Sequence, residues 1–228
     1  MTQSLGQEIV LWGRLVRFSH TIFAMPFALA MFAYVSSFTP VTATQFIAIV
    51  LAMIAARTAA MTFNRIIDRD IDSLNPRTRE REIPAGLVSL RSAWTLWVLS
   101  CLLFLLAAWN LGLHCLVLAP FVLAILCYYS WAKRFTSWSH AILGLSLAMA
   151  PGGVWYALTG HADWLPLWMM FGVLFWVAGF DILYSCQDLE FDRSQTLWSV
   201  PASYGERWAF VIARGFHIVA VGCLAGFG

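Results

Sequence analysis

The sequence has few charged residues: only 11% of its 228 residues are Asp, Glu, Lys or Arg, against about a quarter in soluble domains. Apolar residues make up 61%, against about 45–50% in soluble domains. This scarcity of polar surface argues against a water-soluble enzyme and against a disordered protein. The chain also lacks the alternating pattern of outer-membrane strands. The remaining class is a polytopic helical membrane protein, and the 12 Trp and 17 Phe residues suit helices that end at a lipid–water interface.

Three further patterns are missing. Most basic residues occur in short segments between apolar stretches, so the sequence predicts no nucleic-acid-binding surface. The five cysteines show no Cys-x-x-Cys spacing and the five histidines no metal-binding spacing, which favours structural roles over disulfides or metal ligation. No Asp is followed by Gly, so the Asp-Gly-x-x-Ala-Arg signature of CDP-alcohol phosphotransferases is absent.

Runs without charge predict seven membrane-spanning helices. Residues 18–56 contain no charged side chain and break at Thr39-Pro40, which leaves room for two spans of about 20 residues each. Residues 92–132 divide near Asn110-Leu111-Gly112 into a third and a fourth span. Residues 135–162, 164–186 and 208–228 hold the fifth, sixth and seventh.

The positions of Lys and Arg predict the orientation of these spans. The loops on one side carry 12 of the 14 basic residues, and the loops on the other side carry none. By the positive-inside rule the amino terminus and the basic loops are cytoplasmic, and we expect a bacterial inner membrane protein. A cleavable signal peptide at Ala28-Leu29-Ala30 is disfavoured, because the apolar run continues into Tyr34.

A first carboxylate group, Asn64, Asp68 and Asp72, lies at the cytoplasmic end of the second span. Their i, i+4, i+8 spacing places them on one face of a continuing helix. Asp70 would then point away from this face and pair with Arg65 or Arg69.

A second carboxylate group ends the sixth span and consists of Asp181, Asp188 and Asp192. Tyr184, Asp188 and Asp192 repeat the i, i+4, i+8 spacing, and Asp181 lies one turn deeper on the same face. Both spans run from outside to cytoplasm, so both groups end at the same membrane depth. If the groups face each other, their like charges need cations, and oxygen ligands favour Mg²⁺. The alternative is that both are solvated helix ends, paired with neighbouring arginines such as Arg193.

Basic and aromatic residues accompany the two groups. Arg57, seven residues before Asn64, is costly within a membrane helix unless it meets an anion or an acid. Tyr129 and Lys133, followed by Arg134, share a face at the cytoplasmic end of the fourth span. Multivalent anions need such donors, and the loop arginines Arg77, Arg79 and Arg81 must pass close to the first group. Arg214, in the seventh span, has no assigned role.

These motifs resemble the UbiA superfamily of intramembrane aromatic prenyltransferases. Arg57 with Asn64-x-x-x-Asp68-x-x-x-Asp72 resembles the first family motif, and Asp181-x-x-Tyr184-x-x-x-Asp188-x-x-x-Asp192 the second. Tyr129-x-x-x-Lys133-Arg134 resembles a third, shorter signature. The segments from Arg17 to Phe27 and from Arg81 to Gly86 resemble the 4-hydroxybenzoate polyprenyltransferase branch, including relatives assigned to menaquinone synthesis by the futalosine route.

The resemblance implies a substrate and a set of residue roles. A polyprenyl diphosphate would bind two Mg²⁺ ions held by Asp68, Asp72, Asp188 and Asp192, with Asn64 assisting. Lys133 would neutralise the leaving group, and Asp181 would assist proton loss from an aromatic acceptor such as 4-hydroxybenzoate, in ubiquinone or menaquinone synthesis. Arg57 and Arg134 would hold the carboxylate of the acceptor. Other residues assigned to substrate binding are Arg69, Arg79, Arg81, Tyr129 and Tyr184.

Two departures from the family and three alternatives remain. Thr196 stands where the family usually has Gly, and Trp198 replaces a commoner basic or His residue. Family members have nine helices, so a single domain spanning residues 1–228 would lack the last two. A cation-coupled transporter, a family member acting on another acceptor, and a non-catalytic assembly subunit are the alternatives. A transporter predicts acids near the bilayer midplane, whereas here they cluster at one end.

Overall fold

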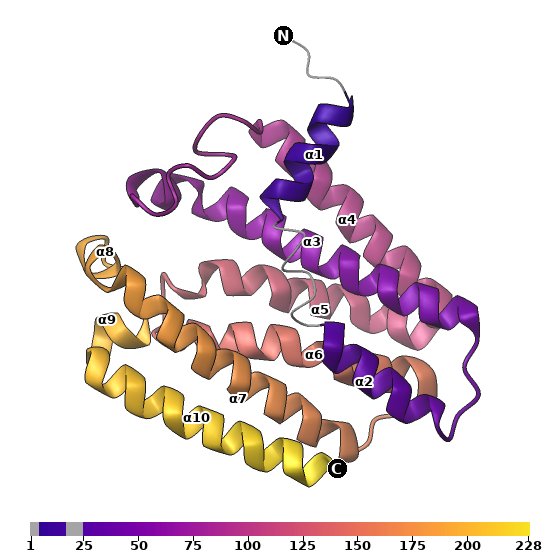
Figure 1. The fold of residues 1–228 in the computed structure, drawn as a ribbon. Helices are drawn as coiled ribbons and strands as arrows, with labels where there is room; N and C mark the ends of the chain where they lie inside the picture. The colour runs from indigo at the N-terminus through magenta and orange to yellow at the C-terminus, as the bar shows by residue number, and fades with distance from the viewer. Residues whose placement is uncertain (1–4, 17–24) are drawn as a thin grey trace. The chain divides into compact units, whose positions relative to one another are not determined.

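The computed structural model describes residues 5–16 and 25–228, and all regular structure in these ranges is helical, as predicted (Figure 1). The helices are α1 (Leu5–Leu15), α2 (Met25–Ser36), α3 (Ala43–Leu74), α4 (Leu90–Leu111), α5 (Leu113–Ala132), α6 (Ser139–Thr159) and α7 (Leu165–Ser185). A 3₁₀ turn (Cys186–Asp188) follows, and then come α8 (Leu189–Ser194), α9 (Val200–Tyr204) and α10 (Glu206–Phe227).

Six of the described helices are long and apolar enough to cross a membrane, namely α3, α4, α5, α6, α7 with its extension to Ser194, and α10. They correspond to the second to seventh predicted spans. The predicted division near Asn110 is confirmed, because Gly112 (φ +131°) separates α4 from α5 and donates its N–H to the carbonyls of Ala108 and Trp109. Of the first predicted span, only α2 and the turn after it are described, since residues 17–24 lie outside the described ranges.

The chain forms two compact units, one of Met1–Phe23 and Thr44–Leu123, the other of Ala24–Ala43 and Ala124–Gly228. The first unit packs α3 and α4 through their aromatic side chains, with the Phe63 ring centroid 5.5 Å from that of Trp97. Trp12 of α1 donates to the Ser92 hydroxyl at 2.8 Å, which ties α1 to the start of α4. Leu15 and Leu96 are buried together beside this contact.

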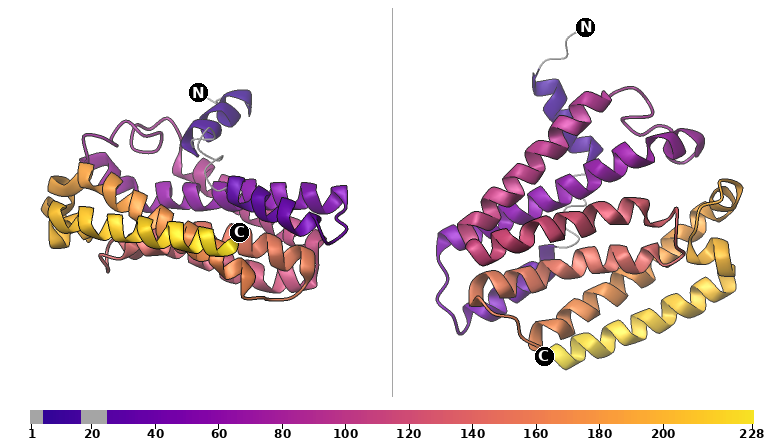
Figure 2. Two further views of the ribbon diagram at one scale, coloured as in Figure 1. Left: turned by 60° about the horizontal axis from the view of Figure 1, so that its bottom comes forward. Right: turned by 180° about the vertical axis from the view of Figure 1, so that it is seen from behind.

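In the second unit, α7 lies between α6 and α10, and all three run alongside one another (Figures 1 and 2). Glycines allow this close approach, as is common where membrane helices pack. A Cβ atom at Gly144 of α6 would clash with the backbone carbonyl of Leu174 in α7, and one at Gly179 of α7 would lie 3.1 Å from the Ala213 carbonyl of α10. Ile182, Val200, Ala209 and Ala213 form a buried cluster at one end of this layer. The end of α7 is therefore held firmly on both sides.

Candidate functional site

The first carboxylate group lies on α3, which stays helical from Ala43 to Leu74. The predicted common face is therefore correct in its backbone geometry. Asp68 and Asp72 are 2% and 4% exposed. The Asn64 side-chain amide donates to Asp68 Oδ2 at 3.0 Å, which orients one carboxylate oxygen. Ionisable side chains buried in an apolar helix are expensive unless they serve a site, so this burial favours function over a solvated helix end.

Asp70 points away from this face, as its helical phase predicts. Its side chain is 84% exposed and accepts a hydrogen bond from Arg69 Nε at 3.2 Å. The predicted substrate contact of Arg69 gains no support from this arrangement, because Arg69 Nε is engaged with Asp70 on the exposed side of α3. Asp70 is thus exposed, whereas Asp68 and Asp72, two residues before and after it on the same helix, are buried.

The loop after α3 brings Arg81 onto Asp72. Arg81 Nη1 lies 2.7 Å from both carboxylate oxygens of Asp72. The loop folds back because the Thr78 hydroxyl donates to the Asp72 carbonyl at 3.1 Å and the Arg81 N–H donates to the Thr78 carbonyl at 2.9 Å. Arg79, in the same loop, is exposed. The sequence predicted a role for Arg81 towards substrate but not its pairing with Asp72.

Two other arginines of α3 differ in their surroundings. Arg57 Nε is buried and has no hydrogen-bond partner among the described residues. An unsatisfied buried donor of this kind is costly, so it fits an anionic ligand better than a purely structural role. Arg65, which is 4% exposed, donates from Nε to the Leu15 carbonyl at 3.4 Å. Sequence reasoning assigned Arg65 only to the nearby acids and missed this contact with the end of α1.

A 3₁₀ turn interrupts the helix that carries the second carboxylate group, a break that the sequence did not predict. Helix α7 ends at Ser185, and Asp188 closes the 3₁₀ turn before α8 begins. A 3₁₀ turn advances about 120° per residue instead of about 100°, so three such residues add about 60° of rotation. Across the seven residues from Asp181 to Asp188 this leaves the two about 40° apart, the same offset as between Asp68 and Asp72, and contacts with other segments orient Asp181 and Asp192.

A buried histidine orients Asp181. His140, near the start of α6, is 3% exposed, and its Nδ1 lies 2.7 Å from Asp181 Oδ2. The Val200 N–H donates to Nε2 of the same ring at 3.3 Å. Sequence reasoning gave His140 a structural role, because the histidines show no metal-binding spacing. It missed this contact, since no pattern in the chain links residues 41 positions apart.

The segment after α8 orients Asp192. The Ser199 hydroxyl donates to Asp192 Oδ2 at 2.9 Å and caps the start of α9 by accepting from Ala202 N–H at 3.3 Å. The neighbouring Trp198 N–H donates to the backbone carbonyl of Lys133 at 2.7 Å. In both contacts the donor lies outside the predicted motifs and the acceptor within one of them.

The third motif lies at the end of α5. Tyr129 belongs to the last turns of the helix, whereas Lys133 and Arg134 come after it in a turn. Arg134 Nη1 donates to the Ser130 carbonyl at 2.8 Å, which satisfies a carbonyl at the helix end. Tyr184 on α7 is 40% exposed, with its ring 6.3 Å from that of Phe180.

Thr196, one of the two departures from the family pattern, has an unusual backbone conformation. Its φ is +52°, and Leu197 N–H bonds to the Asp192 carbonyl while Thr196 N–H bonds to that of Arg193. This is the Schellman arrangement that ends a helix, in which the residue with positive φ is usually Gly. A β-branched residue there is strained.

We therefore expect Thr196→Gly to stabilise the protein by about 1 kcal/mol, after allowance for the greater freedom of glycine in the unfolded chain. The midpoint of thermal unfolding in detergent should rise by about 2–4 °C. Thr196→Ala keeps the Cβ atom and is the matched control, which should show no such rise. An equal rise in both variants would attribute the effect to the lost hydroxyl instead of the backbone.

The oxygen atoms of the first carboxylate group suit a metal ion whose remaining ligands come from the substrate and from water. Within residues 5–16 and 25–228, no three His, Cys, Asp or Glu side chains lie close enough together to bind a metal ion by themselves. Mg²⁺ is commonly held by one or two carboxylates, with water and substrate phosphates as the other ligands. The buried oxygens of the first carboxylate group match this ligand class, and they include neither sulfur nor imidazole.

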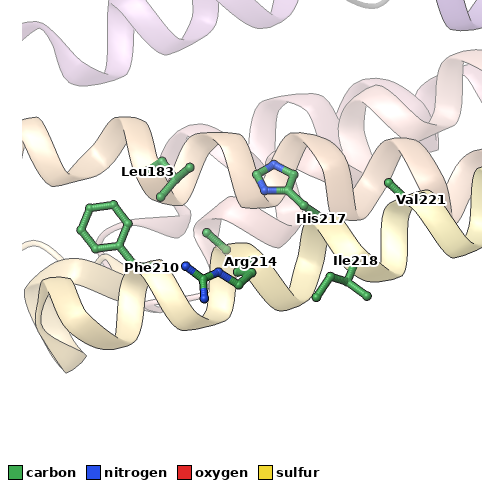
Figure 3. A pocket seen from close by; sticks show the side chains of 7 residues that line it. Leu183, Phe210, Arg214, His217, Ile218 and Val221 are labelled. Atoms are coloured by element: carbon green, nitrogen blue, oxygen red, sulfur yellow. The ribbon is translucent and has the colours of Figure 1, made fainter.

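A groove lies between α7 and α10 (Figure 3). It is open, has a volume of about 570 Å³, and is lined mainly by apolar side chains, including Leu183 and Phe210. Arg214 and His217 of α10 are its polar members. None of the predicted site residues lines this groove, so it is not the binding site that the motifs indicate.

The chain matches known proteins over most of its length. The model of the UbiA prenyltransferase family matches residues 23–228. A protoheme IX farnesyltransferase from Thermosynechococcus vestitus is 39% identical over 53% of this chain and 38% of its own length. A 4-hydroxybenzoate octaprenyltransferase from Albidiferax ferrireducens is 31% identical over 62% of this chain and 48% of its own length. The matched segment thus spans less than half of either relative.

Solved structures share the fold. The apo structure of a UbiA homologue from Aeropyrum pernix K1 aligns with a TM-score of 0.84 at 38% identity, over 90% of this chain and 77% of that one. A UbiA homologue from Archaeoglobus fulgidus, bound to DMAPP and Mg²⁺, aligns with a TM-score of 0.77 at 20% identity, over 95% and 77%. Together with six potential membrane spans and the motif residues on α3 and α7, these matches lead to one conclusion: the chain belongs to the UbiA prenyltransferase family.

Proposed function

We propose that this protein is a membrane-embedded prenyltransferase that uses a prenyl diphosphate and Mg²⁺. The observation that carries the proposal is the buried face of Asn64, Asp68 and Asp72, with Arg81 held against it. A helix that must lie in lipid would not bury two carboxylates without a ligand that uses them. DMAPP or GPP is bound with Mg²⁺ in structures of the Archaeoglobus fulgidus homologue, which supports the same class of donor here.

The proposed roles follow the chemistry of each side chain. Asp68, Asp72, Asp188 and Asp192 bind magnesium, and Asn64 contributes its amide oxygen. Bound Mg²⁺ supplies Lewis acidity that stabilises charge on the departing diphosphate. Arg81, Lys133, Arg79 and other loop cations bring positive charge to the same leaving group. We place two ions in this role, as the four carboxylates suggest.

The reaction exchanges one bond for another. The allylic C–O bond to diphosphate breaks, with its electron pair leaving on oxygen. A new C–C bond forms at an acceptor carbon, and the proton on that carbon passes to a base, for which Asp181 is our candidate. Tyr129 and Tyr184 can shield the allylic cation through their ring faces.

We propose an aromatic acid as the acceptor, with Arg57 and Arg134 binding its carboxylate. The buried and unsatisfied Nε of Arg57 supports this assignment. A relative named protoheme IX farnesyltransferase makes a porphyrin the second candidate, and it also carries carboxylates that arginine can bind. We further propose that the protein lies in a bacterial inner membrane with its basic loops in the cytoplasm, because of the positive-inside pattern.

The decisive experiment is a transfer assay with the purified protein in detergent or nanodiscs. Mg²⁺, a prenyl diphosphate and either 4-hydroxybenzoate, related aromatic acids or protoheme would be supplied, and products identified by mass spectrometry. We expect a prenylated aromatic acid, its loss in excess EDTA and its recovery with Mg²⁺. Full turnover in excess chelator would contradict the metal role. If prenylated protoheme is the product formed in place of a prenylated aromatic acid, the proposed acceptor would be a porphyrin instead. If no acceptor gives a product, the proposed prenyltransferase activity would be rejected.

A further inference from the structure

The hydrogen bonds of His140 define its proton arrangement. A backbone amide can only donate, so Nε2, which accepts from Val200 N–H at 3.3 Å, must carry a lone pair. The ring proton then sits on Nδ1, 2.7 Å from Asp181 Oδ2. His140 is thus a neutral imidazole in a single tautomer, donating to a carboxylate. Asp181 remains 22% exposed while His140 is 3% exposed, so the histidine holds the carboxylate from the protein side and leaves it accessible.

Val200, which donates the second hydrogen bond to His140, belongs to a short segment that makes two more contacts with predicted site residues. In the consecutive residues Trp198, Ser199 and Val200, the first donates to the Lys133 carbonyl and the second to the Asp192 carboxylate. The third donates to His140, which holds Asp181. We call residues 198–200 the anchoring segment. One short stretch of chain therefore contacts, directly or through His140, three residues proposed to act on the substrate.

A purely structural histidine is a poor explanation of this arrangement. A buried polar pair generally stabilises a protein no better than two well-packed apolar residues of similar volume. An apolar residue at 140 would leave the Val200 N–H without its acceptor. It would also not remove the cost of the Asp181 charge at membrane depth. The pair makes sense where an ionised carboxylate must be kept in one orientation, as second partners do for catalytic groups.

We propose that His140 is a positioning residue for Asp181, and that it couples Asp181 to the anchoring segment. The inference rests on the proposed function, because Asp181 is the base in that scheme. The acceptor carbon loses its proton to a carboxylate oxygen of Asp181, which becomes a carboxylic acid and later releases the proton to water. His140 keeps its Nδ1 proton throughout and supplies a fixed hydrogen bond that keeps the Asp181 carboxylate in one orientation.

The test separates orientation from substrate binding. His140→Leu removes both hydrogen bonds and should lower kcat about tenfold, while the KM values for prenyl diphosphate and acceptor stay within twofold. His140→Gln retains one donor and one acceptor and should recover a large part of kcat. His161→Leu, at an exposed loop position, is the matched control and should be unaffected. Unchanged kcat in His140→Leu, or no recovery in a folded His140→Gln, would overturn the proposal.

A second measurement does not depend on the catalytic activity of any variant. Nitrogen-15 NMR of labelled histidine side chains in the detergent-solubilised protein reports which ring nitrogen carries the proton. The His140 signal, identified by its absence in His140→Gln, should show a protonated Nδ1 and an unprotonated Nε2. The opposite tautomer would overturn the inference even in an active enzyme. If the wild-type protein forms no prenylated product, the proposed function and the role of Asp181 fail together, whatever the tautomer.

Discussion

Asp68→Asn should lower the steady-state rate of prenyl transfer by on the order of 100-fold or more, the scale expected when one charge-stabilising contact is lost. Asp68 is 2% exposed, lies on the common face of α3 and accepts from the Asn64 amide. Asparagine is nearly isosteric, so the packing of α3 survives, but a neutral amide binds Mg²⁺ far less strongly than a carboxylate. Rates would be measured at saturating Mg²⁺ and prenyl diphosphate.

Asp70→Asn is the matched control, two residues away on the same helix. Its side chain is 84% exposed and pairs only at the surface with Arg69, where such pairs contribute little. We expect a loss of less than about tenfold, or below about 1.4 kcal/mol in activation free energy. Both variants should elute with the wild type in size exclusion. Equal losses at the two positions would mean that the buried face of α3 is not where magnesium binds.

Arg81→Gln should raise the KM for prenyl diphosphate about 10- to 100-fold, because a hydrogen bond to a charged group contributes about 1.5–3 kcal/mol. Arg81 now neutralises Asp72, with Nη1 at 2.7 Å from both oxygens. In the substrate complex we expect the guanidinium to turn to the diphosphate while magnesium takes over Asp72. Arginine therefore competes with the metal before substrate binds and assists the substrate afterwards.

This dual role gives Arg81→Gln an unusual signature. Without substrate, the variant should bind Mn²⁺, followed by electron paramagnetic resonance, at least as tightly as wild type, although its diphosphate affinity falls. Arg91→Gln, an exposed arginine at the start of α4, should change neither value. If Arg81→Gln weakens both metal and diphosphate binding, Arg81 supports the fold of the loop instead of competing at Asp72. Thermal unfolding would detect that case, because an unpaired buried Asp72 is destabilising.

Much of the fold was predictable because lipid imposes local rules on a chain. A membrane span needs about 20 apolar residues and leaves no backbone group unpaired, so helices and their approximate limits follow from composition alone. The break at Gly112 and the helix through Asp68 and Asp72 are both of this kind. The opposite exposures of Asp68 and Asp70 likewise follow from the helical repeat of about 100° per residue.

The continuity of α7 could not be predicted in this way. The sequence repeat of Tyr184, Asp188 and Asp192 suits an unbroken helix, yet a 3₁₀ turn occupies Cys186–Asp188. Beyond this turn, the Ser199 hydroxyl donates to the Asp192 carboxylate, and Thr196 takes a positive φ after α8. Helical periodicity assumes one regular repeat, so it carries no signal for a local change of backbone hydrogen bonding such as this turn.

The sequence by itself therefore determined the class of the protein, its second to seventh predicted spans and the residue types that suit a diphosphate and magnesium. Only the tertiary structure decided which partners orient those residues: Arg81 on Asp72, His140 on Asp181 and Ser199 on Asp192. The physical reason is the separation along the chain over which each kind of signal acts. Apolar runs and helical spacing act between near neighbours in the chain, whereas the bond from His140 to Asp181 spans 41 positions and that from Val200 to His140 spans 60. Such contacts exist only after the helices have packed, and glycines such as Gly144 and Gly179 set how closely they do.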